Sequence, residues 1–222
     1  MDRSKIKTVI TLAILPFLVT GIERLIIKPV ISIFPLPDTS IYLVKVGVIT
    51  LLLMAISAFR GNTYGLGISK KLGKVLGVMF LALIATCYFF LFSLRLKGFF
   101  DSFVVIHLAN WIIGVFREEF ILRGVIQTES GSIFKGTFLK VSQSIWFTTI
   151  IFSLWHLVNL TIWPWQTVGL QMLACIPSGI VLGFIREKTG NTLLTYLLHI
   201  CGDLLFFSCY LLIFGKLFFT LY

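Results

Sequence analysis

Apolar segments long enough to cross a bilayer recur along the whole chain, and this feature restricts the fold more than any other. A hydrocarbon core of about 30 Å needs about 20 helical residues at a rise of about 1.5 Å each. The mean hydropathy of +1.00 is far above that of soluble domains. We predict an all-α polytopic bundle that forms a single membrane domain over residues 1–222, with seven spans at residues 6–28, 41–59, 75–94, 102–127, 143–162, 166–185 and 191–214.

Basic residues are distributed unequally between the two sides of these spans. Eleven of the 19 lie on one side, namely Arg3, Lys5, Lys7, Arg60, Lys70, Lys71, Lys74, Lys135, Lys140, Arg186 and Lys188. Five lie on the other side, namely Arg24, Lys28, Arg95, Lys97 and Lys216. The positive-inside rule then predicts a cytosolic N-terminus and, with seven spans, a C-terminus outside. We expect an integral protein of a bacterial cytoplasmic membrane.

The net charge of +10 is first a topology signal and secondarily favours contact with anionic lipid in the bilayer. Nucleic acid is not an expected partner, because the basic residues are dispersed among the spans. The polar stretch at residues 60–74 is predicted to be a cytosolic loop. The cysteines lack C-x-x-C spacing and are expected to be small buried hydrophobic residues, namely Cys87, Cys175, Cys201 and Cys209.

Four charges in the stretch REEFILRG, residues 117–124, fall inside the fourth predicted span. An intramembrane carboxylate costs about 3 kcal/mol on insertion scales, so it is a hypothesis about function by default. Glu119 and Arg123 are four residues apart on one helix face and can compensate each other. Glu118 points about 100° away and lacks that partner, which suits it to general-base work. Alternatively, the helix ends early and these charges are interfacial.

Two of the three histidines lie in later predicted spans, each with a partner one helical turn away. Phe152 can pack against the imidazole of His156, and Asp203 can accept the ring N–H of His199. Helical rise places Glu118 at a depth of about 14 Å, His199 at about 12 Å and His156 at about 20 Å from the cytosolic end. These depths permit one shared site, although His156 is deeper than the other two.

These motifs, in the order Glu118-Glu119-x-x-x-Arg123, Phe152-x-x-x-His156 and His199-x-x-x-Asp203, resemble the CAAX protease and bacteriocin-processing (CPBP) family of intramembrane proteases. The resemblance covers a core of residues 100–215. It implies hydrolysis of a peptide bond in a membrane-embedded cavity, on a membrane-associated peptide or protein substrate. Glu118 and His156 would activate a water molecule, and His199 with Asp203 would stabilise the oxyanion. Glu119, Arg123 and Phe152 would support these four.

The family accepts Asn or Asp at the last position, and this chain has Asp203. An ionised Asp only accepts hydrogen bonds and would repel an oxyanion, whereas an Asn amide donates one. Either Asp203 is protonated or it orients His199 so that the imidazole alone donates. We favour the second interpretation.

Three alternatives remain open from the residues. Two histidines with carboxylates could ligate a catalytic zinc ion, but no H-E-x-x-H motif is present, and the glutamate mechanism requires no metal or other cofactor. The same fold could serve as a non-catalytic immunity or scaffold protein of the membrane. Buried Glu and His also occur in proton-coupled carriers, although the inverted repeats common in carriers are not evident here.

Overall fold

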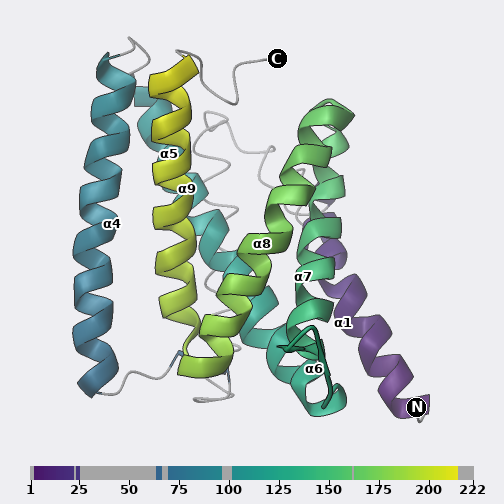
Figure 1. Cartoon of the computed structure of the whole chain (residues 1–222). Coiled ribbons are helices and arrows are strands. Elements are labelled where there is room, and N and C mark those ends of the chain that lie inside the picture. The colour runs from purple at the N-terminus through teal and green to yellow at the C-terminus, as the bar shows by residue number, and fades with distance from the viewer. Residues whose placement is uncertain are drawn as a thin grey trace.

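The protein is a bundle of long helices that lie approximately side by side (Figure 1). The computed structural model describes residues 3–22, 24–25, 64–66, 70–96, 102–161 and 163–214. The predicted span at residues 41–59 lies outside these described residues. Five of the described helices are long and apolar enough to cross a membrane. The all-α polytopic prediction therefore agrees with the structure over the residues that it describes.

Helices α4 (Lys70–Leu96), α5 (Ser102–Glu119) and α9 (Thr192–Phe214) form one side of the bundle. Figure 1 shows α4 at the outer edge beside α9, with α5 passing behind α9. Apolar side chains from all three helices form a buried cluster that includes Phe90, Leu94, Val115, Ile200 and Leu204. The side chain of Asn191 accepts a hydrogen bond of 2.8 Å from the amide of Leu194 and thereby caps the start of α9.

Helices α1 (Arg3–Ile22), α7 (Gln143–Trp155) and α8 (Trp165–Thr189) form the other side of the bundle. Their apolar cluster contains Leu12, Ile151, Phe152, Trp155 and Cys175, together with residues 121, 122 and 126. A Cβ atom at Gly179 of α8 would lie 2.9 Å from Thr149, and one at Gly183 would lie 2.8 Å from Ile145. These glycines therefore allow the close approach of α7 and α8 that small residues give membrane helices.

One continuous helical segment connects the two sides. Helix α5 continues without interruption into a π-helix, η3 (Phe120–Ile126), and then into α6 (Gln127–Ile133). A π-helical turn holds one residue more than an α-helical turn and is often found at functional sites. The predicted span at residues 102–127 is thus helical, but it extends to Ile133 and contains this wider turn directly after Glu119.

A short β-hairpin follows α6 and is not predicted from the sequence. Strands β1 (Thr137–Phe138) and β2 (Val141–Ser142) pair antiparallel. The hydroxyl of Ser142 accepts a hydrogen bond of 3.4 Å from the amide of Ile145 at the start of α7. Helix α7 then changes at His156 into a 3-10 helix, η4 (His156–Thr161), which completes the predicted span at residues 143–162.

The polar stretch at residues 60–74 is only partly a loop. Residues 64–66 are irregular, and α4 already begins at Lys70. Gly65 has φ +75°, and a Cβ atom there would lie 2.5 Å from the carbonyl oxygen of Gly190. The carbonyl of Gly65 accepts a hydrogen bond of 2.8 Å from the amide of Thr192. This contact fixes the segment at the junction of α8 and α9, where only glycine fits without strain.

Candidate active site

The centre of the site is a buried carboxylate that contacts two basic side chains from different directions. Glu119, the last residue of α5, accepts a hydrogen bond from His199 of α9, with 2.9 Å between Oε1 and Nδ1. Its Oε2 lies 3.7 Å from Nε of Arg123 in η3. The side chains of Glu119 and Arg123 are fully buried. The predicted pairing of these two residues on one helix face is present in the structure.

Glu119 therefore determines how the imidazole of His199 is oriented. A carboxylate only accepts hydrogen bonds, so Nδ1 of His199 carries the hydrogen of this contact. The other nitrogen, Nε2, is directed toward Asp203, whose Oδ2 lies 3.6 Å away. That separation is an electrostatic contact and exceeds hydrogen-bonding distance. The orienting role that the sequence assigned to Asp203 is thus better performed by Glu119.

The site becomes more open from Glu119 toward Asp203. The side chain of Glu119 is 0% exposed, that of His199 is 9% exposed and that of Asp203 is 34% exposed. Nε2 of His199 consequently faces the more open side of the site. A substrate carbonyl or a water molecule can reach this nitrogen from the direction of Asp203 without displacing the buried pair.

His156 lies on the neighbouring helix and contacts the same aromatic ring as His199. The ring centroid of Phe152 is 5.0 Å from that of His156 and 5.7 Å from that of His199, edge-on in both cases. The guanidinium carbon of Arg123 lies 5.7 Å from the centroid of the same Phe152 ring. Phe152 therefore links all three groups, although helical rise alone had placed His156 deeper than His199.

The tautomer of His156 follows from its backbone contact. Its Nδ1 lies 2.9 Å from the carbonyl oxygen of Phe152. A carbonyl only accepts, so Nδ1 carries the hydrogen, and in the neutral ring Nε2 retains a lone pair. The thiol sulfur of Cys175 in α8 lies 3.5 Å from Nδ1 and 3.8 Å from Nε2. The imidazole is thus held at one edge while Nε2 can accept a proton.

Glu118 precedes the buried pair and is only partly buried. Its charge interacts electrostatically with His199 and Asp203 on α9 and with Cys175 on α8. Glu118 is therefore close to the residues that surround both imidazoles. The structure places the two adjacent glutamates differently, as the helical phase predicts: Glu119 is buried in an ion pair, and Glu118 remains partly accessible.

Comparison with known families identifies the segment that contains this site. Residues 100–205 match the family model of type II CAAX prenyl endopeptidase Rce1-like proteins. Over these residues the chain is similar to the Rce1-like CAAX protease family. The resemblance predicted from the three motifs is confirmed, and all seven predicted site residues lie within the Rce1-like segment. A search of curated proteins and a search of solved structures each gave no match.

Two contacts of the Rce1-like site were not predicted from the sequence. The first is the hydrogen bond between Glu119 and His199, which are 80 residues apart. The second is the packing of Cys175 against His156, where the sequence indicated only a small buried hydrophobic residue. Burial is confirmed for Cys175 and Cys201, whereas Cys87 is half-buried and the prediction is wrong for Cys209, which is exposed. The partner of Cys175 was not identifiable, because the contact depends on how α8 packs against α7.

Within the described residues, no group of three or more His, Cys, Asp or Glu side chains is arranged to hold a metal ion. The acidic and basic groups instead contact each other: Nδ1 of His199 is engaged by Glu119, and Nδ1 of His156 by a backbone carbonyl. Of the four imidazole nitrogens, a metal could therefore reach only the two Nε2 atoms without breaking these contacts.

Proposed function

We propose that this protein is an intramembrane endopeptidase that hydrolyses a peptide bond of a membrane-associated peptide or protein. The observation that carries the proposal is that, within the Rce1-like segment, two oriented imidazoles contact the same ring of Phe152, and the charge of Glu118 interacts with one of them, His199. Integral membrane placement follows from the apolar helices and the family. The substrate is assigned no further than this class.

Two sets of side chains have separate roles in the proposed reaction. One set accepts a proton from water, and the other stabilises the negative charge that forms on the substrate. Glu118 and Nε2 of His156 accept a proton from water as its oxygen attacks the substrate carbonyl carbon. The carbonyl electrons move to the oxygen, and the hydrogen on Nε2 of a protonated His199 donates to this oxyanion. The oxyanion electrons then re-form the carbonyl as the C–N bond breaks, and the nitrogen that leaves with the electrons of this bond takes the proton held by Glu118 and His156, which gives one new carboxyl and one new amino terminus.

Glu119 supports the second of these roles through its bond with Nδ1 of His199. By accepting that hydrogen, the carboxylate keeps the ring in a single orientation and stabilises its positive charge when Nε2 is also protonated. Asp203 lies 3.6 Å from Nε2 at the more exposed side. An ionised Asp203 would stabilise the imidazolium but not the oxyanion, so His199 supplies the donor in this mechanism.

The mechanism as proposed uses no metal ion, and water activation depends on Glu118 and His156 alone.

We further propose a seven-span topology with a cytosolic N-terminus in a bacterial cytoplasmic membrane. In support, the basic N-terminus of α1, the end of α8 with Arg186 and Lys188, and the hairpin with Lys135 and Lys140 lie at the same end of the bundle (Figure 1). This is the end expected to face the cytosol.

Replacement of Glu118 by Gln tests the proposal, because the amide retains the size of the side chain but cannot take up the proton. Purified wild-type protein in liposomes should cleave candidate membrane peptides, and Glu118→Gln should lower the rate at least 100-fold. Glu129→Gln, a change of the same kind on α6, should leave the rate unchanged. Cleavage by Glu118→Gln at the wild-type rate would refute the assignment of the base.

The same variants distinguish the enzyme from a non-catalytic immunity or scaffold protein. An enzyme loses its biological effect when both His156 and His199 are replaced by Ala, provided the double variant still accumulates in the membrane. A scaffold retains the effect, because binding of a partner does not require proton transfer.

A further inference from the structure

The hairpin between α6 and α7 exposes large apolar side chains at an otherwise polar turn. Its two turn residues are Leu139 and Lys140, and the strand residue Phe138 precedes them. The exposed fraction is 59% for Phe138 and 72% for Leu139. An apolar tip of this kind is unusual on a hairpin that faces water, where turns are built mainly from polar residues and glycine.

The backbone of the turn is also unfavourable for these residues. Leu139 has φ 51° and Lys140 has φ 62°. Two successive residues with positive φ form a type I′ turn, which Asn-Gly adopts with little strain. A branched Leu in this conformation is strained, and such strain persists when the surrounding structure or a function requires the side chain. The strained turn therefore indicates that the exposed position of the Leu139 side chain has a structural or functional role.

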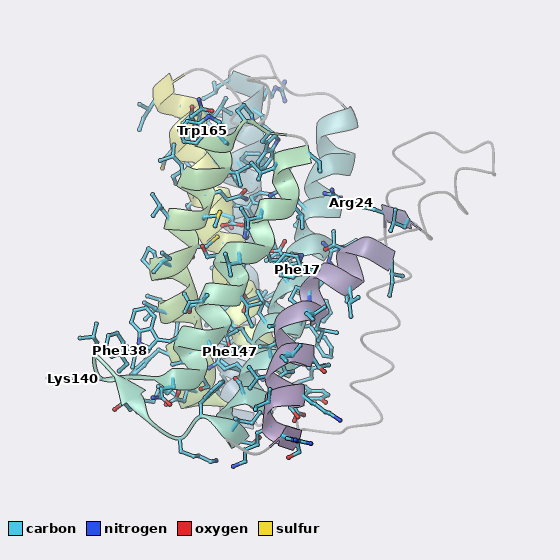
Figure 2. The ribbon with its side chains drawn as sticks, turned by 90° about the vertical axis from the view of Figure 1, so that its right-hand side faces the viewer. Phe17, Arg24, Phe138, Lys140, Phe147 and Trp165 are labelled. Atoms are coloured by element: carbon cyan, nitrogen blue, oxygen red, sulfur yellow. The ribbon has the colours of Figure 1, made fainter. Side chains whose placement is uncertain are left out.

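The tip of the hairpin folds back against the first turn of α7. The indole N–H of Trp146 donates a hydrogen bond of 2.9 Å to the carbonyl of Phe138, and the two rings pack with centroids 5.8 Å apart. Trp146 follows the first residue of α7, Gln143, by three residues, which is about 4.5 Å along the helix axis. Figure 2 shows Phe138 and Lys140 at the outer edge of the molecule, near the end where α1 begins.

The length of the span places the level of Trp146 at the edge of the hydrocarbon layer. Residues 143–161, as α-helix followed by 3-10 helix, extend over about 30 Å, which is the thickness of the hydrocarbon core. Gln143 therefore lies at one boundary of the core. A hairpin folded back to Trp146 lies in the zone between headgroups and acyl chains, where Trp side chains are enriched.

The charges around the tip complement anionic headgroups. Lys135 and Lys140 are exposed, and neither forms an ion pair with another residue that the structure describes. Glu187, an acidic residue at the base of the hairpin, accepts a hydrogen bond of 2.6 Å from Ser142. The lysine amines can thus reach lipid phosphates without first breaking an ion pair within the protein.

The geometry points to a lipid-binding role: the hairpin at residues 134–142 inserts Phe138 and Leu139 below the headgroups of the leaflet nearest the N-terminus, while Lys135 and Lys140 bind the phosphates of anionic lipids. The partner is the surface of an anionic bilayer. This role is independent of the proposed protease activity. Binding to lipid would anchor the hairpin beside the first turn of α7, the helix that directly precedes His156.

A spin label at the tip tests the insertion directly. The four cysteines are replaced by Ala, and a nitroxide is attached at Leu139→Cys in vesicles of phosphatidylcholine with phosphatidylglycerol. Inserted labels should be more accessible to oxygen than to a water-soluble nickel complex. The matched control is Ser132→Cys, an exposed position on α6, where the preference should be reversed. A label at 139 that is as accessible to nickel as the control would overturn the proposal.

Removal of the lysine charges tests the contribution of the headgroups. Each lysine near an anionic surface favours the inserted state about fivefold. Lys135→Gln and Lys140→Gln together should therefore lower the ratio of inserted to water-exposed label about 30-fold in vesicles that contain phosphatidylglycerol. The ratio should be unchanged in pure phosphatidylcholine. An equal effect in both lipids would refute the binding of anionic headgroups.

Hydrogen exchange gives a test that needs no cysteine replacement. Wild-type protein in nanodiscs should show slower amide exchange over residues 136–142 with phosphatidylglycerol than in phosphatidylcholine alone, with residues 127–133 unchanged. Protection that appears only when a cleavable peptide is added, in either lipid, would instead identify the hairpin as a docking site for the substrate and would overturn the lipid assignment.

Discussion

The buried pair of Glu119 and Arg123 makes a quantitative prediction about stability. Its closest atoms are 3.7 Å apart, and both side chains are fully buried. At an effective dielectric constant of about 20, the attraction between unit charges at this distance is about 4.5 kcal/mol. The guanidinium nitrogens Nε, Nη1 and Nη2 have no hydrogen-bond partner in the described structure, so Glu119 supplies most of the compensation for this buried charge.

Either single substitution should therefore be strongly destabilising. Arg123→Met leaves a buried carboxylate without the arginine charge beside it, and Glu119→Gln leaves a buried guanidinium opposite a neutral amide. We expect each to lower the free energy of unfolding by about 3 to 5 kcal/mol. The double variant removes both charges and should lose about 3 kcal/mol less than the sum of the two single effects.

The measurement is equilibrium unfolding in mixed micelles of dodecyl maltoside and sodium dodecyl sulfate, followed by circular dichroism. Arg24→Met provides the control, because this arginine donates to the carbonyl of Val158 and to Thr161 but forms no ion pair with a described acidic residue. Its effect should add to that of Glu119→Gln within about 0.5 kcal/mol. Additive losses for Glu119 and Arg123 as well would refute the electrostatic coupling inferred from their geometry.

Three further predictions concern helix packing, the position of α7 and metal dependence. Gly183→Ala should cost about 1 to 3 kcal/mol of stability in the same assay, because its Cβ would lie 2.8 Å from Ile145, whereas Gly169→Ala on the same helix has free space and should cost nothing. Trp155→Phe should cost about 1 kcal/mol through loss of its 2.8 Å hydrogen bond to Thr20, measured against wild type; no change would show that this bond does not hold α1 against α7. Dialysis against EDTA should leave proteolysis unchanged and elemental analysis should find less than about 0.1 metal ion per chain, whereas activity restored only by added zinc would contradict the mechanism.

The helical bundle was largely predictable because each span is determined by local composition. Six of the seven predicted spans overlap described helices, and the seventh lies outside the described residues. Five of these six helices are long and apolar enough to cross a membrane, whereas the helix of the predicted span at residues 102–127 is not among those five. The start of α4 was missed by five residues, because Lys70, Lys71 and Lys74 give its first turns the composition of a loop. Hydropathy does not distinguish a helix that continues into the interface from a polar connection.

The candidate site was predictable where its contacts lie one helical turn apart. Glu119 with Arg123, Phe152 with His156 and His199 with Asp203 all follow from the i and i+4 positions of a helix. The bond from Glu119 to His199 could not be predicted in this way, since it depends on the rotation of α5 relative to α9. The sequence consequently assigned the orientation of His199 to Asp203, its neighbour on the same helix.

The hairpin was not predictable because its turn lacks the usual signals. Leu139 and Lys140 occupy positions where Asn and Gly would indicate a type I′ turn, and each strand has only two residues. Their conformation is stabilised by the contact of Phe138 with Trp146, which lies in the following helix. Local propensity alone therefore predicts an irregular connection at this position.

The π-helix that follows Glu119 sets the relative orientation of two contacts on either side of it. Before it, Glu119 is bonded to α9 through His199; after it, Gln127 donates a hydrogen bond of 2.7 Å to the carbonyl of Gly183 in α8. If the same residues adopted an ordinary α-helix, the residue that the wider turn takes up would turn Gln127 by about 100° relative to Glu119. The two contacts could not then form together, so the wider turn allows one continuous helical segment to bond to both neighbouring helices.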